Sequence, residues 1–146
     1  MSQTLKKGEM ETLEAIFEKE EAKATSSSSP FNVVVDLCGI FKLTNIYDVR
    51  ELILKHFGSD VFHYIYHIDQ TDGSDKMLCI KSQNNVTFDE EFYKYLCRSY
   101  GDNLGQKVFF FIDNRNYIGK VGLILPSVFA HRCVLTCSSL GRNNNL

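Results

Sequence analysis

The chain lacks tryptophan and any long hydrophobic run, and both absences narrow the class of protein. It has 146 residues with no Trp, but 11 Phe and 7 Tyr still supply large side chains for a core. No apolar run approaches the roughly 18 residues of a membrane span, and the polar segment 1–10 does not predict a secretory signal. With 44% hydrophobic and 23% charged residues, the composition predicts a globular domain with tails. We therefore expect no membrane partner.

The chain also lacks a strong net charge, although its charges are unevenly placed. The formal net charge is -2. Residues 26–113 carry twelve acids and eight bases, whereas residues 114–146 carry four bases and no acid. A net negative charge on residues 26–113 disfavours contact with the phosphate backbone of a nucleic acid. We therefore expect no nucleic-acid partner.

Familiar catalytic signatures are missing as well. The sequence has no G-x-S-x-G, no glycine-rich phosphate loop and no H-E-x-x-H. A zinc site at His131, Cys133 and Cys137 would lack a fourth ligand. Five cysteines without a regular framework indicate reduced thiols in the cytosol or the nucleus. We expect no enzyme, no metal and no cofactor, and a small cysteine-dependent enzyme is the catalytic alternative, since folding could pair a cysteine with a histidine.

Two N-terminal segments and a C-terminal tail flank the predicted domain. Residues 1–25 form an amphipathic helical extension, because residues 9–24 place apolar side chains at helical spacing among charges. This helix either packs on its own domain, which we favour, or docks on a partner. The serine-rich segment 26–30 predicts a linker. The tail 114–146 is interpreted as partly disordered, as a docking tail or as part of an incomplete element, and residues 117–129 could supply a strand.

Residues 31–113 alternate between strand-like and helix-like patterns. One helix is well marked, because Asn45 and Asp48 have the spacing of an N-terminal cap and Gly58 is placed to end it. The capping-box pattern of Thr87 and Glu90 opens a second helix. Strands are expected at 31–37, 40–43, 61–68, 77–80 and 107–112, and the first helix, 46–57, should bury Val49, Leu52, Ile53 and Phe57.

This order of elements predicts the fold class. Strand, strand, helix, strand, strand, helix, strand is the order of an α+β, ubiquitin-like β-grasp fold, with a mixed sheet packed on one main helix. Right-handed crossovers then place the first and last strands side by side in the centre of the sheet. The N-terminal helix is an addition to this plan.

Six acids gather in two neighbouring segments, namely the turn of the second hairpin and the start of the following helix. Aspartates form turns well and acids suit a helix N-terminus, so local structure can explain them. Together they would also attract the Lys and Arg residues of a partner. We refer to this set as the acidic face: Asp69, Asp72, Asp75, Asp89, Glu90 and Glu91.

The same segments resemble a known family. Tyr66, an acid-rich turn around Gly73, a return strand and an acid-led helix look like the OPCA motif of the Phox-and-Bem interaction domains. The resemblance covers residues 31–113 and implies a signalling scaffold or adaptor module whose acidic face binds the basic face of a partner, which can be a homologous domain. That family carries a lysine on its first strand, where this chain has Asn32 and Asp36. The implied type therefore has an acidic face only.

A sister family gives an alternative interpretation. Residues 30–33, Pro-Phe-Asn-Val, and residues 89–92, Asp-Glu-Glu-Phe, also resemble the CIDE-N domains of DNA-fragmentation factors. That resemblance implies a regulatory module that pairs with its partner charge to charge. The longer hairpin and the missing basic second strand favour the first family. Residues 9–17 resemble the opening helix of RWD domains, without the turn that follows it there.

Overall fold

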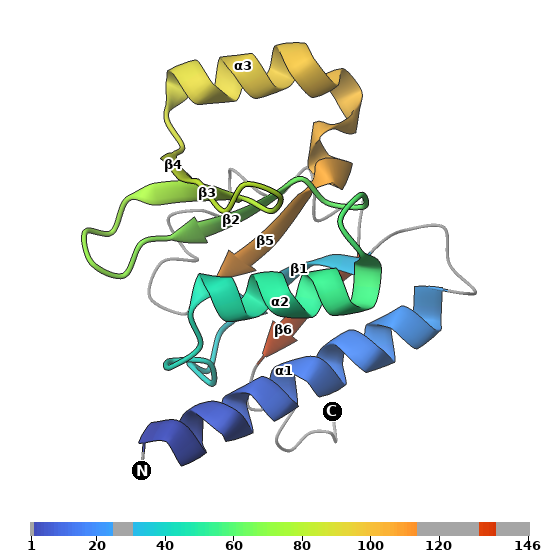
Figure 1. Ribbon diagram of the computed structural model, residues 1–146, viewed down its shortest axis with the longest axis vertical. Helices are drawn as coiled ribbons and strands as arrows, with labels where there is room; N and C mark the ends of the chain where they lie inside the picture. The colour runs from blue at the N-terminus through green and yellow to red at the C-terminus, as the bar shows by residue number, and fades with distance from the viewer. Residues whose placement is uncertain (1, 25–30, 114–131, 137–146) are drawn as a thin grey trace.

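A mixed sheet lies between two helical layers in the computed structural model, which describes residues 2–24, 31–113 and 132–136 (Figure 1). Helices α1 (Ser2–Ala24) and α2 (Ile46–Phe57) lie on one side of the sheet. Helix α3 (Glu90–Tyr100) lies on the other side, and the 3-10 helix η1 (Gly101–Lys107) follows it. The predicted α+β class with a mixed sheet is confirmed.

The sheet has six strands in the order β4-β3-β2-β5-β1-β6. Strand β5 runs parallel to both of its neighbours, β1 and β2, whereas β2, β3 and β4 form antiparallel pairs. The first and last predicted strands are therefore neighbours, as expected. The strands are β1 (Phe31–Asp36), β2 (Tyr64–Ile68), β3 (Asp75–Cys79), β4 (Asn85–Thr87), β5 (Val108–Ile112) and β6 (Arg132–Thr136).

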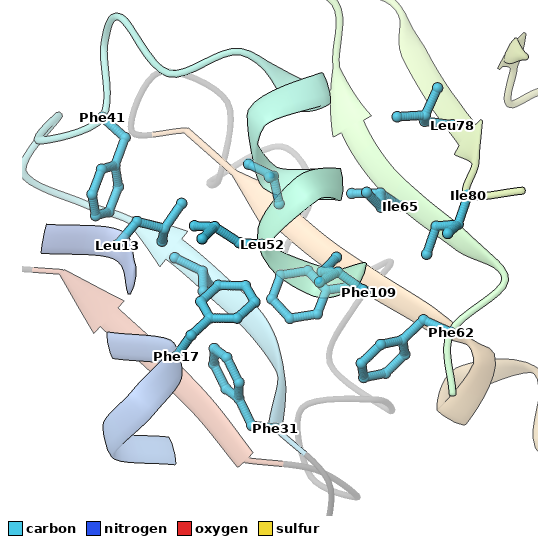
Figure 2. Packing of buried hydrophobic residues seen from close by; sticks show 13 residues of the cluster. Leu13, Phe17, Phe31, Phe41, Leu52, Phe62, Ile65, Leu78, Ile80 and Phe109 are labelled. Atoms are coloured by element: carbon cyan, nitrogen blue, oxygen red, sulfur yellow. The ribbon is translucent and has the colours of Figure 1, made fainter. Parts of the chain in front are cut away.

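Both faces of the sheet are buried, which explains the nearly continuous apolar runs of its parallel strands. Side chains alternate along each strand between the two cores. Val34 and Phe109 belong to the core beneath α1 and α2, which Figure 2 shows from close by. Val33 and Phe110 belong to the second core, which also contains Leu96 of α3. The sheet thus supports a helix on each face.

Helix α1 packs on the rest of the chain. Leu13 and Phe17 are fully buried in the first core. The ring of Phe17 lies 5.4 Å from that of Phe31 and 5.6 Å from that of Phe109, measured between centroids (Figure 2). The Glu9 carboxylate accepts hydrogen bonds from the backbone N–H groups before α2. The favoured interpretation, a helix packed on its own domain, is confirmed.

The first predicted helix is confirmed together with its cap. The Asn45 side chain accepts from the Asp48 N–H at 3.0 Å, and the Asp48 carboxylate accepts from the Asn45 N–H at 3.3 Å. Val49, Leu52 and Ile53 are buried, and Phe57, of the same expected set, packs partly buried against the same core. Gly58 follows with φ 81. Local sequence signals alone define this helix.

The predicted cap of the second helix is wrong by two residues. Thr87 is the last residue of β4, a strand that the sequence pattern did not predict. The cap is Asp89, whose carboxylate accepts from the Phe92 N–H at 2.9 Å, and α3 begins at Glu90. Backbone pairing with β3 holds Thr87 extended, since Lys76 lies opposite it. The pairing of β4 with β3 therefore prevents the capping box predicted for Thr87 and Glu90 from forming.

The predicted strand 40–43 is also wrong. Both carboxylate oxygens of Asp36 accept a backbone N–H, from Ile40 and from Phe41, each at 2.9 Å. The Leu43 N–H donates to Glu9 of α1 instead. Because these backbone N–H groups bond to carboxylates, they do not pair with a neighbouring strand. The segment is therefore a turn and forms no hairpin with β1. The place beside β1 is occupied by β6, which runs parallel to it.

These findings leave the β-grasp plan as a prediction. The parallel pairing of β1 with β5 agrees with it, whereas the missing hairpin and a helix on each face depart from its simplest form. Strand β6 lies in the tail 114–146, for which the sequence suggested a strand at 117–129 instead. The linker 26–30, the segment 117–129, and His131 and Cys137 of the zinc pattern lie outside the described residues. No helix among the described ones combines the length and apolar content needed to cross a membrane.

Candidate functional site

Two members of the acidic face shape the turn between β2 and β3. The Asp69 carboxylate accepts from the Thr71 N–H at 2.7 Å. The Asp72 carboxylate accepts from the Ser74 N–H at 2.9 Å and from the Ser74 hydroxyl at 2.7 Å. The Ser74 hydroxyl and then the Ser74 N–H lower the pKa of Asp72. The interpretation of these aspartates as turn formers is therefore confirmed, and the Asp72 charge stays exposed on the turn.

Asp75 stands where this turn enters β3. It lies opposite Ile68 in the ladder, and its side chain is half-buried. Its carboxylate is close to the hydroxyl of Tyr66. Burial, and then the charge of Asp75, raises the pKa of Tyr66, which keeps its phenol protonated. The Tyr66 hydroxyl is itself buried; its neighbour is the Asp75 carboxylate, and in the described part of the chain no group donates to its oxygen.

The remaining three acids begin α3. Asp89 caps the helix, and Glu90 and Glu91 are exposed in its first turn. Acids at this position stabilise a helix through its dipole, so their placement has a local explanation too. In addition, Asp89 and Glu90 approach Asp75 from the other acidic segment.

That approach forms a shallow recess, which we name the acidic recess. It has a volume of about 250 Å³ and is lined by Asp75, Phe88, Asp89, Glu90 and Tyr93. Three of the six predicted site residues therefore share one surface feature with two aromatic rings. The backbone explains the proximity, because the Phe88 N–H donates to the Asp75 carbonyl at 2.8 Å.

The structure places Asp69 apart from this recess. Asp69 lines a larger pocket, of about 450 Å³, together with Asp36 and Asp113. These three acids follow or end the parallel strands β2, β1 and β5, and the carboxyl ends of parallel strands are a common place for ligands. His67 also lines the pocket, and its Nε2 is 2.9 Å from the Asn85 side-chain oxygen. Burial lowers the pKa of His67, so this pocket holds a neutral imidazole at neutral pH.

The alternative of a cysteine-dependent enzyme needs a cysteine close to a histidine, and among the described cysteines Cys79 shares a pocket with one. Cys79 and His63 line one small pocket of about 100 Å³. Burial raises the pKa of the Cys79 thiol, but hydrogen bonds from the Ser82 side chain and nearby backbone outweigh it and lower that pKa overall. Burial also lowers the pKa of His63, and its Nδ1 is 2.7 Å from the Tyr100 hydroxyl. That ring nitrogen therefore interacts with Tyr100, not with the thiol.

One group of side chains in the described residues has ligand atoms close enough for a metal ion. Glu14, Glu18 and His56 bring their ligand atoms within 4.8 Å of one another where α1 meets α2. Glu14, however, already binds the Lys55 ammonium and lies 3.0 Å from His56 Nε2, and Glu21 lies 2.8 Å from His56 Nδ1. These contacts tie α1 to α2 as an ion-pair cluster. Because the partners belong to two helices far apart in the sequence, no local sequence pattern predicts this cluster.

Comparisons of the chain with protein-family models, with curated proteins and with solved structures give no match. The resemblances to the Phox-and-Bem and CIDE-N domains therefore stay predictions. Any assignment of function depends on the geometry of the acidic face.

Proposed function

We propose that the domain formed around residues 31–113 is a protein-interaction module, a scaffold or adaptor, which binds a basic partner protein through the acidic face. The single observation that carries the proposal is the acidic recess. It joins the hairpin turn to the start of α3 and adds aromatic side chains, including the half-exposed Tyr93, to the acids. A surface that combines acids with an exposed tyrosine suits a partner rich in Lys and Arg.

Four acids of this surface have no ion-pair partner in the described part of the chain. Asp72, Asp89, Glu90 and Glu91 form no ion pair within the described residues, whereas several acids elsewhere pair with Lys, Arg or His, as Glu14 does with Lys55. Local hydrogen bonds to Asp72 and Asp89 use only part of what a carboxylate can accept. The remaining acceptor capacity points to solvent, where a cationic side chain can reach it.

Exposed ion pairs are individually weak, so binding must come from several acting together. Each such pair contributes about 0–1 kcal/mol. Complementary charge speeds the encounter of two proteins more than it strengthens the final complex. The interaction is therefore expected to weaken with salt, chiefly through slower association.

The resemblance to the Phox-and-Bem domains supports a signalling adaptor, and the cytosol or nucleus expected from the cysteines is part of this proposal. A regulatory module of the CIDE-N kind is the alternative. Both interpretations use charge pairing, and the identity of the partner distinguishes them. The proposal assigns no catalytic role to the chain.

An affinity-capture experiment with matched charge changes tests the proposal. The full chain is compared with Glu90→Lys/Glu91→Lys on the acidic face and with Glu11→Lys/Glu51→Lys, which makes the same change of charge on exposed residues of α1 and α2. Thermal melts confirm that both variants fold. Quantitative mass spectrometry should show partners of the wild type and the control variant that the first variant loses. Equal capture by all three proteins, at low and at moderate salt, would contradict the proposal.

A further inference from the structure

A second hollow lies next to the acidic recess, between α3 and the sheet. It has a volume of about 220 Å³, and its apolar lining includes Met77, Leu104, Val108 and Phe110. Two residues, Phe88 and Tyr93, line both this cavity and the acidic recess. The two features are therefore neighbours, and Tyr93, which is 46% exposed, belongs to the wall of both.

One of the residues that line this apolar cavity carries a buried polar group. Tyr66 is fully buried, its hydroxyl lies near the Asp75 carboxylate, which only accepts hydrogen bonds, and no group of the described residues donates to the hydroxyl oxygen. Buried hydroxyls are nearly always paired, and an unpaired one destabilises the protein that contains it. A group that entered the cavity with a donor at its tip would pair with the Tyr66 hydroxyl oxygen.

The size of the cavity limits what can enter. An apolar cavity of about 150 Å³ accepts a benzene molecule in another protein. At about 220 Å³, this one fits a single aromatic side chain, whereas sites for drug-sized ligands usually measure about 300–1,000 Å³. Aromatic side chains that fill such pockets dominate the affinity of many interfaces.

We propose that the basic partner inserts one tyrosine or tryptophan side chain into this cavity, and that a Lys or Arg close to it in the partner's sequence binds the acidic recess. This inference rests on the proposed function and names the chemistry that the partner must carry. The tip of the aromatic side chain would donate to the Tyr66 oxygen, and the cation would meet Asp75, Asp89 and Glu90. Charge would then guide the encounter, and the aromatic side chain would hold the complex.

Synthetic peptides test the inference on the full chain, labelled with nitrogen-15 for NMR titration. The first probe is the blocked pentapeptide Lys-Gly-Tyr-Gly-Lys, and the second replaces its Tyr with Ala. The Tyr peptide should shift amide resonances of Met77 and Leu104 and bind at least about tenfold more tightly than the Ala peptide. Equal affinities, or no shift at these residues, would overturn the inference.

Variants of α3 separate the cavity from the charges. Cys97 lines the cavity, so Cys97→Leu fills it, whereas Ser99→Leu makes a similar change on the exposed side of the same helix. The advantage of the Tyr peptide over the Ala peptide should disappear in the first variant and persist in the second. Persistence in both would overturn the inference. If Cys97→Leu fails to fold, the affinities of the two peptides for the wild-type chain still confirm or overturn the inference.

The failure of the inference can be distinguished from the failure of the proposed function. Salt-sensitive binding of both peptides with equal affinity overturns only the aromatic anchor. Peptide affinities that change neither with salt nor with Glu90→Lys/Glu91→Lys would overturn the proposed function and the cation contact together.

Discussion

Replacing Phe17 with Ala should strongly destabilise the protein, because this residue of α1 lies within the first core. Its side chain is fully buried. Its ring packs against those of Phe31 and Phe109, as Figure 2 shows, and also against that of Phe57, with centroids 5.4–5.9 Å apart. The substitution would therefore remove a large apolar side chain and several ring contacts at once.

The magnitude follows from the burial of this ring. A buried Phe→Ala change costs about 3–5 kcal/mol, and aromatic pairs add about 0.5–1.5 kcal/mol beyond area. We expect a loss near the upper end, about 4–5 kcal/mol in the free energy of unfolding. That is a large part of the roughly 5–15 kcal/mol that stabilises a typical domain.

Urea denaturation of the full chain, followed by circular dichroism, measures this loss. Leu5→Ala serves as the control, because Leu5 lies on the same helix and is 59% exposed. The control should change the free energy of unfolding by no more than about 0.5 kcal/mol. Phe17→Leu should fall between the control and Phe17→Ala. A loss below about 1 kcal/mol for Phe17→Ala would refute the packing of α1 and revive its interpretation as a docking helix.

Three further predictions concern side chains near the candidate site. Asp89→Ala removes the cap of α3 and should lower the free energy of unfolding in urea melts by about 0.5–2 kcal/mol, whereas Asp89→Asn should cost much less; equal losses would contradict the capping role. Alkylation of Cys79, followed by peptide mass mapping, should have a lower pH midpoint in the folded chain than in urea, because hydrogen bonds lower its pKa in the fold; identical midpoints would contradict this. Burial raises the pKa of Tyr64 from 10.0 to about 12, so its contribution to stability is fully present below pH 10 and is lost as the pH rises toward 12. Tyr64→Phe should therefore make the free energy of unfolding less dependent on pH in that window, and an unchanged dependence would disprove the assignment.

Local signals in the sequence were enough to predict several elements. The apolar period of residues 46–57 and the cap formed by Asn45 and Asp48 defined α2, since both act within a few residues. Continuous apolar runs identified β1 and β5 as buried strands. Their parallel pairing also followed from the order of the elements.

Contacts that no sequence pattern displays account for the errors. Asp36 and Glu9 accept the backbone N–H groups of residues 40–44, and no local pattern reveals that two acids will do so. Strand β4 exists because it pairs with β3, and β6 because it pairs with β1. The Glu9 contacts and the pairing of β6 with β1 depend on partners far away in the sequence, whereas the Asp36 hydrogen bonds and the β3–β4 pairing are short-range contacts that the pattern did not display.

The candidate site divides in the same way. The exposed position of Asp72, Glu90 and Glu91 follows from turn and helix-start chemistry, which the sequence displays. The acidic recess and the neighbouring cavity cannot be predicted from such local chemistry, because both depend on the pairing of β3 with β4 and on the position of α3 over the sheet. The separation of Asp69 from Asp75 likewise depends on which way each side chain leaves the turn.

The association rate between the full chain and its captured basic partner tests the central claim most directly. Surface-based kinetics would be recorded at about 50 mM and about 300 mM salt, for the wild type and for Glu90→Lys/Glu91→Lys. If the acidic face guides binding, the wild-type rate should fall at least about tenfold over this range, and the variant should be slow at both salts. A rate that is the same for both proteins and does not change with salt would contradict the account.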